Sequence, residues 1–238
     1  MRILFFLIIA IILTSCGAVS PMASNVKLDL SRSGLIQIPA EVFENKELKV
    51  LKLFGNQLDS VSSRIGELVN LEELYIGKNN LTTLPKEIGQ LKNLKILSLQ
   101  YNEIDSLPNE IGGLENLETL WLDQNRLISL PDSIGKLKKL KVLQVRFNRL
   151  ETLPAGLGEC EMLSLLYLNR NNLTALPKEM GNLKQLREIY LAGSGALNQI
   201  PESFCDLRYL EILEISQSNV LPACLLVLKA NRLQIIEH

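Results

Sequence analysis

A 23-residue repeat dominates the sequence between Leu71 and Gly181. Each pass places leucines or isoleucines, one asparagine, one proline and one glycine at the same positions. The first pass consists of Leu71, Leu74, Ile76, Asn79, Leu81, Leu84, Pro85, Ile88, Gly89 and Leu91. The same types return from Leu94 and again from Leu117. A fixed period of this size is typical of a solenoid, in which each unit buries its apolar face against the next.

Each unit has two halves with different periodicities. The alternation at Leu74 and Ile76 predicts a short strand with one buried and one exposed face. In the second half, Leu84, Ile88 and Leu91 follow helical spacing. The preceding proline fits the first turn of a short helix or 3-10 segment, and the glycine fits a tight exit. Strands and compact helices form walls of unequal width, so stacking them predicts a curved solenoid with the strands inside the arc.

The pattern L-x-x-L-x-L-x-x-N-x-L resembles the leucine-rich repeat. The resemblance implies an α/β fold, a leucine-rich repeat solenoid with parallel strands on the concave face and short helical or 3-10 segments on the convex face. We expect it to cover residues 25–220 as nine units. The units start at Asn25, Leu48, Leu71, Leu94, Leu117, Leu140, Leu163, Leu186 and Leu210.

An asparagine follows most of the predicted strands, where the chain turns. Its side-chain amide can bond backbone groups that the turn leaves unpaired, which would otherwise cost about 1–3 kcal/mol each. We therefore predict a ladder formed by Asn56, Asn79, Asn102, Asn125, Asn148 and Asn171. Near the ends the same place is taken by Ser33, Ser194 and Ser218.

The N-terminus is predicted to lie outside this fold. An apolar run from Ile3 to Leu13 is too short to span a bilayer as a helix. It ends in Leu13-Thr14-Ser15-Cys16, which resembles a bacterial lipobox. The resemblance implies a lipoprotein signal peptide over 1–15, lipid attachment at Cys16 and a tether over 16–24. By resemblance to enteric-type sorting, Gly17 favours the outer membrane; an ordinary secretory signal with a chance cysteine is the alternative.

The C-terminal residues 221–238 depart from the repeat and are predicted to cap the open end of the core, with a docking helix for a partner as the alternative. Cys160 occupies a column held by leucine in other units, which predicts a buried thiol. Cys205 and Cys224 lie in the C-terminal units and could form a disulfide after export, but the sequence does not decide this.

No catalytic or cofactor-binding constellation stands out. His238 is the only histidine and the last residue, so neither a Ser/His nor a Cys/His nucleophile is available. There is no Cys-x-x-Cys and no cluster with metal-ligand spacing, so we predict no metal, no cofactor and no enzymatic activity. The net charge is −1 with acids and bases interspersed, which argues against a nucleic-acid partner.

Aromatic residues concentrate at the strand position that faces solvent. This column is Asp29, Lys52, Tyr75, Ser98, Trp121, Gln144, Tyr167, Tyr190 and Glu214, and it holds the only tryptophan and three of five tyrosines. Neighbouring positions add Phe54 and Arg146, and also Tyr101 and Phe147, which we expect to be partly buried at the rim. Exposed Trp, Tyr and Arg carry binding energy at interfaces. The predicted partner-binding residues are therefore Phe54, Tyr75, Trp121, Arg146, Tyr167 and Tyr190. The alternative is that aromatic residues simply favour strands.

The sequence thus predicts a lipid-anchored protein of the bacterial cell envelope or surface, with the outer membrane as the expected location. Its expected partner is a macromolecule, a protein in the first place, bound on the concave sheet. The alternative is a structural protein that organises the envelope from the periplasm without a dedicated ligand on the concave face. Partner identity and oligomeric state are left open.

Overall fold

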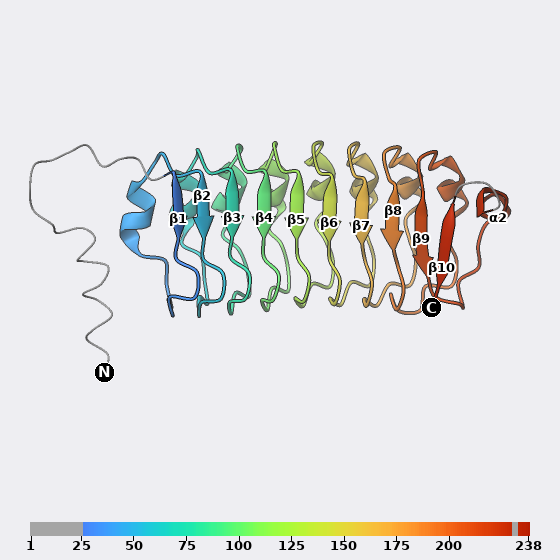
Figure 1. The fold of residues 1–238 in the computed structure, drawn as a ribbon, viewed down its shortest axis with the longest axis horizontal. Helices are drawn as coiled ribbons and strands as arrows, with labels where there is room; N and C mark the ends of the chain where they lie inside the picture. The colour runs from blue at the N-terminus through green and yellow to red at the C-terminus, as the bar shows by residue number, and fades with distance from the viewer. Residues whose placement is uncertain (1–25, 230–232) are drawn as a thin grey trace, which may run out of the picture.

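The computed structural model describes residues 26–229 and 233–238 (Figure 1). The predicted signal peptide, Cys16 and the tether lie outside the described residues. The rest forms one elongated stack of repeated units, with the strands along one wall and the 3-10 helices along the other (Figure 1).

The strands form one parallel ten-stranded sheet in sequence order. They are β1 (Lys27–Asp29), β2 (Val50–Lys52), β3 (Glu73–Tyr75), β4 (Ile96–Ser98), β5 (Thr119–Trp121), β6 (Val142–Gln144), β7 (Leu165–Tyr167), β8 (Glu188–Tyr190), β9 (Ile212–Ile215) and β10 (Gln234–Glu237). Their register aligns the central buried leucines, as in the pairs of Leu74 with Leu97 and of Leu97 with Leu120. A slip of one residue would turn these leucines to solvent, so the repeat itself fixes the register. The predicted parallel sheet is confirmed.

The second half of each unit is a 3-10 helix, as predicted. These helices are η1 (Ala40–Glu44), η2 (Ser63–Glu67), η3 (Lys86–Gln90), η4 (Asn109–Gly113), η5 (Asp132–Lys136), η6 (Ala155–Glu159), η7 (Lys178–Asn182) and η8 (Glu202–Asp206). A proline precedes each helix except η2, where the Ser62 hydroxyl accepts a hydrogen bond from the Arg64 N–H at 3.2 Å. The backbone N–H at this position has no acceptor within the helix, so proline loses no hydrogen bond there. A serine at the same position can use its hydroxyl to cap the helix.

The core lies between the two walls and consists of the repeated leucines and isoleucines. Leu74, Ile76 and Ile88, for example, have no exposed surface, and each such side chain contributes about 2 kcal/mol through burial. Cys160 is also fully buried, which confirms its predicted environment. Burial raises the pKa of its thiol to about 12, and its Sγ lies 3.3 Å from the carbonyl oxygen of Ile134.

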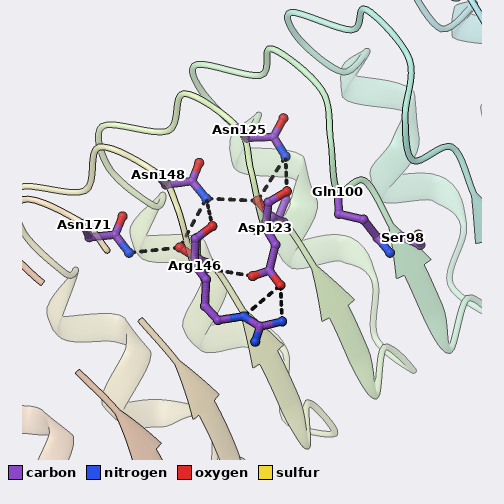
Figure 2. Close-up of polar contacts among 9 residues, drawn as sticks. Ser98, Gln100, Asp123, Asn125, Arg146, Asn148 and Asn171 are labelled. Carbon is purple, nitrogen blue, oxygen red and sulfur yellow. Dashed lines mark hydrogen bonds and ion pairs between the residues drawn. The ribbon is translucent and has the colours of Figure 1, made fainter. Parts of the chain in front are cut away.

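The asparagine ladder is present along the turns. Asn125 Nδ2 donates to the carbonyl oxygens of Leu99 and Leu122, both at 3.0 Å, and its Oδ1 accepts from the Ile104 N–H at 3.0 Å. Asn148 and Asn171 repeat the pattern one and two units further on (Figure 2). Each amide therefore joins neighbouring units through buried groups that would otherwise lack partners.

The ladder changes at the C-terminal end. The Ser194 hydroxyl donates to the Leu168 carbonyl at 2.8 Å, as predicted for a serine in this place. In the next unit Asn219, not Ser218, makes the contacts: its Oδ1 accepts from the Ser216 N–H at 2.8 Å and its amide donates to the Leu197 carbonyl. The turn there has shifted by one residue.

The glycines of the 3-10 helices were predicted to allow a tight turn at the helix end, but the structure gives them a different role. A Cβ at Gly89 would lie 2.2 Å from the carbonyl oxygen of Glu110 in the next helix. The same closeness recurs at Gly135, 2.3 Å from the Gly156 carbonyl, and at Gly158, 2.2 Å from the Glu179 carbonyl. None of these three residues has a positive φ. Glycine is needed here because successive helices touch through their backbones.

Residues 221–238 contain α2 (Ala223–Lys229) and β10. Leu225 and Leu233 are buried, and β10 pairs in parallel with β9 as a tenth strand beyond the nine units expected. Cys205 in η8 and Cys224 in α2 are joined by a disulfide, with 5.8 Å between their Cα atoms. The question left open by the sequence is thus decided in favour of the bond. Within residues 26–229 and 233–238, no helix has the length and apolar character needed to cross a bilayer.

Candidate binding surface on the strand face

The strand face is the side of the sheet turned away from the 3-10 helices. In each strand the residues on both sides of the central leucine lie on it, as Leu165 and Tyr167 do around buried Leu166. The predicted solvent-facing column is therefore on this face and in register: Tyr75 pairs with Ser98, and Ser98 with Trp121. On the same face a second, largely apolar column comprises Val50, Glu73, Ile96, Thr119, Val142, Leu165, Glu188 and Ile212.

This second column is not among the predicted binding residues, which were taken mainly from the position between the two strand leucines. The signal was present one position before the first of them, where Ile96, Val142 and Leu165 recur. In a strand, residues two apart share a face. The strand face therefore carries an apolar column beside the aromatic one.

Two tyrosines and one arginine form a stacked group at β6 to β8. The Tyr167 and Tyr190 rings are parallel within 5°, with centroids 4.6 Å apart. The Arg146 guanidinium lies over the Tyr167 ring, 5.2 Å from its centroid. The Tyr190 hydroxyl donates to Glu188 Oε2 at 2.7 Å. This hydrogen bond, followed by burial, raises the pKa of Tyr190, and burial raises the pKa of Tyr167, so both phenols are neutral at physiological pH.

Arg146 is held in place by Asp123. Its Nε and Nη2 donate to Asp123 Oδ2 at 3.0 and 2.7 Å, and its backbone N–H donates to Oδ1 at 2.7 Å (Figure 2). The Asp123 side chain is 12% exposed, and its hydrogen bond raises the pKa of Arg146. Arg146 therefore presents a fixed planar group with a compensated charge, which suits stacking better than capture of a free anion.

A hollow of about 370 Å³ opens next to this group. It is lined by Arg146, Phe147, Tyr167, Asn169, Arg170, Tyr190 and Glu214. At its far side Asn169 Nδ2 donates to Glu214 Oε1 at 3.0 Å, and His238 Nε2 lies 3.4 Å from the same oxygen. The hollow thus offers aromatic surface between a basic and an acidic side, which is the composition of an interface anchor pocket.

The other predicted residues lie apart from the hollow. Tyr75 on β3 has Lys52 Nζ 5.4 Å from its ring centroid, and burial together with a hydrogen bond to Glu73 raises its pKa to about 12. Phe54 is half-buried and fills space left by Gly77, where a Cβ would come within 3.1 Å of the ring. The Trp121 Nε1 is buried without a hydrogen-bond partner among the described residues. Arg146, Tyr167 and Tyr190 are therefore the members of the predicted set that the fold brings together.

A ledge of left-handed residues borders the strand face. At the position before each ladder asparagine, and before Ser33 and Ser194, the backbone has positive φ, between 55° and 60° at every non-glycine residue. We call these residues the left-handed ledge: Arg32, Lys78, Tyr101, Gln124, Phe147 and Arg170. Gly55 and Gly193 occupy the same position in two other units, with φ of 72° and 68°. A non-glycine residue in this conformation costs about 1–3 kcal/mol.

The ledge corrects one expectation. Tyr101 and Phe147 were expected to be partly buried, but they are 49% and 45% exposed. The left-handed backbone directs their side chains away from the core, and the buried neighbour Asn102 or Asn148 fills the turn instead. Arg170 lies over the Phe147 ring, 5.1 Å from its centroid. Gly55 and Gly193 were the sequence signal for this conformation, because glycine adopts it freely.

The 3-10 wall has a larger hollow, of about 510 Å³, over η3 and η4. Its lining includes Gly112 and Gly113 together with Lys86, Glu87, Glu110 and Lys136, so acidic and basic side chains are mixed there. Within the described part of the chain, no group of three or more His, Cys, Asp or Glu side chains is placed to hold a metal ion. The strand face is therefore the stronger candidate for binding.

These features define the class of protein. In-register parallel strands, a wall of 3-10 helices and an asparagine ladder make this fold a leucine-rich repeat solenoid. Three family models agree: a leucine-rich repeat region matches residues 84–168, and leucine-rich repeat models match residues 161–221 and 70–91. No match to the chain was found among curated proteins.

Solved structures give more specific relatives. The chain is similar to a leucine-rich repeat protein of Leptospira interrogans, with 28% identity over 88% of this chain and 71% of that one, at a TM-score of 0.54. It is similar to the leucine-rich repeat domain of the type III effector XopL, with 25% identity, coverage of 82% and 75%, and a TM-score of 0.63. The third is the Arabidopsis receptor kinase HAESA in complex with the peptide hormone IDA and the co-receptor SERK1, with 29% identity and a TM-score of 0.72. The match to HAESA covers 89% of this chain but only 37% of that one.

Proposed function

We propose that this chain is a lipid-anchored protein of the bacterial envelope or surface that binds a protein partner on its strand face. The observation that carries the proposal is the group formed by Arg146, Tyr167 and Tyr190 beside a hollow of about 370 Å³. These are the residue types that dominate binding energy at interfaces, where each buried anchor contributes about 2 kcal/mol or more.

The group is prepared for binding before a partner arrives. Asp123 fixes Arg146, and the two tyrosine rings already stack at 4.6 Å. Little rotamer freedom is left to lose on association, and this favours affinity. The apolar column of Ile96, Val142 and Leu165 extends the surface to one side. Binding of the peptide hormone IDA to HAESA is a precedent for a polypeptide partner on a similar solenoid.

The proposed membrane anchor rests on the lipobox at Leu13-Thr14-Ser15-Cys16. Metabolic labelling with an alkyne fatty acid tests it: wild type should incorporate the label and fractionate with membranes, and Cys16→Ser should do neither. Separation of inner from outer membranes then tests the location. Labelling that persists in the Cys16→Ser variant would contradict lipidation at this residue.

A photoreactive amino acid placed at Asn169, inside the hollow, tests partner binding. We expect it to crosslink one discrete protein in intact cells, and we expect the crosslink to disappear in a Tyr167→Ala/Tyr190→Ala background with an unchanged melting temperature. The same photoreactive group at Lys139, which is exposed in the turn between η5 and β6 and does not line the hollow, is the control. Crosslinking only from Lys139 would contradict the proposal and favour a protein that organises the envelope without a ligand on the strand face.

A further inference from the structure

The left-handed ledge consists of side chains that the fold itself does not need. The repeat position that forms the ledge accepts glycine, because Gly55 and Gly193 occupy it in two other units. Asparagine and aspartate, the other types that accept this conformation readily, occur at none of its six positions. Instead each position carries a long side chain in an unfavourable backbone conformation. Because all six are exposed, burial does not compensate for that strain.

The chemistry of the ledge is one-sided. It contains three cations, Arg32, Lys78 and Arg170, two aromatic rings and one amide, and no carboxylate. None of the three cations forms an ion pair with another described residue, whereas Arg126 in a neighbouring turn is paired to Glu103 at 3.2 Å. The ledge therefore has unsatisfied positive charge next to exposed aromatic surface.

From this we infer that the left-handed ledge is a second part of the partner-binding surface and that it receives an acidic segment of a partner protein. Phe147 and Arg170 belong both to the ledge and to the lining of the hollow, so a chain seated in the hollow can continue over the edge. In this respect the inference rests on the proposed function. A lipid surface is disfavoured for two reasons. The hollow next to these residues carries the acidic Glu214, and a flat bilayer could not contact the ledge and the interior of the hollow at the same time.

Two double variants test the ledge. Tyr101→Gly/Phe147→Gly removes the rings and relieves the backbone, so the melting temperature should stay equal or rise. Lys78→Gln/Arg170→Gln removes charge at similar length. The Tyr167→Ala/Tyr190→Ala variant addresses the hollow alone. A melting temperature that falls markedly in Tyr101→Gly/Phe147→Gly would show that the rings serve stability and would overturn the inference.

Binding is measured with a random peptide library displayed on phage, selected on the whole chain. Selected peptides should be enriched in Asp and Glu, and each ledge variant should weaken them by about tenfold or more. Peptides that lack acidic enrichment, or that ignore both ledge variants, overturn the inference; if they still require Tyr167 and Tyr190, the proposed function survives. The inference is also overturned if the wild type selects no peptide. If the wild-type protein pellets with phosphatidylglycerol vesicles and the ledge variants do not, the ledge is assigned to a membrane instead. Peptides sensitive to the ledge but not to the hollow would instead contradict the proposed function alone.

Discussion

Asp123 accepts hydrogen bonds from both the backbone N–H and the guanidinium of Arg146, 23 residues later and one unit further along the sheet. One carboxylate therefore fixes the rotamer of a residue at the centre of the candidate surface. It also keeps the Arg146 side chain over the Tyr167 ring. The orientation of the site is thus determined by a partner that itself has little exposed surface.

Asp123→Ala should destabilise the protein by about 1–3 kcal/mol, because three donors lose a nearly buried acceptor. Urea unfolding measures the loss. Arg146→Ala and the double variant complete a mutant cycle, and we expect the two changes to be clearly non-additive. Additive losses would contradict a direct energetic coupling between the residues.

Asn125→Ala should cost about 2–4 kcal/mol. The substitution leaves the Leu99 and Leu122 carbonyls and the Ile104 N–H without partners inside the turn. Asn80→Ala is the control, since Asn80 is an exposed residue next to the ladder residue Asn79, in the equivalent turn two units earlier. Similar urea midpoints for both variants would contradict the assigned role of the ladder.

Gly89→Ala should destabilise the helical wall by about 1–3 kcal/mol, because the new methyl would lie 2.2 Å from the Glu110 carbonyl oxygen. Gly34→Ala is the matched comparison: its Cβ meets nothing within 4 Å, but its φ is +68°, so we expect a smaller loss of about 1 kcal/mol. Thermal unfolding distinguishes crowding from backbone strain. A larger effect at Gly34 would contradict the explanation from close helix contact.

Tyr75 should ionise late. Burial and the hydrogen bond to Glu73 raise its pKa from 10.0 to about 12. The folded state holds this proton more tightly than the unfolded state, so the stabilising contribution is complete below about pH 10 and is lost as the pH rises through about 12. Ultraviolet titration of tyrosinate, taken as the difference between wild type and Tyr75→Phe, measures the pKa. Glu73→Gln should lower it part of the way; an ordinary value in wild type would contradict the assigned environment.

Cys205→Ser/Cys224→Ser should lower stability by about 3 kcal/mol, the loop-closure contribution expected for a short loop such as the 19-residue separation here. Loss should begin at the C-terminal units, so hydrogen exchange should increase first in α2 and β10. Cys160 provides an internal control because its buried thiol should resist alkylation until the protein unfolds. Uniform exchange along the solenoid would contradict a local role of the disulfide.

Much of the fold was predictable because burial repeats with the sequence. The columns around Leu74 and Ile76 fixed strand register, and the proline at Pro85 marked the helix start. The reason for Gly89 was not predictable, since it depends on how closely the next helix approaches. β10 was missed because Ile235 and Ile236 lack the full repeat around them.

The candidate site was only partly predictable for a related reason. Periodicity places Tyr167 and Tyr190 on the right face, but it says nothing about which rings stack or which acid holds Arg146. The exposure of Tyr101 and Phe147 follows from a positive φ that these residue types do not signal. Only Gly55 and Gly193, at distant ends of the same column, indicated it.

The asparagine ladder has a consequence for how such a surface can change over time. Because Asn79, Asn102 and Asn125 secure each turn in the same way whatever side chains stand beside them, whole units can be gained, lost or exchanged without a new folding solution. Partner choice and structural integrity can then evolve as nearly separate traits. The outward-facing residues determine partner choice, and the inward-facing residues determine structural integrity.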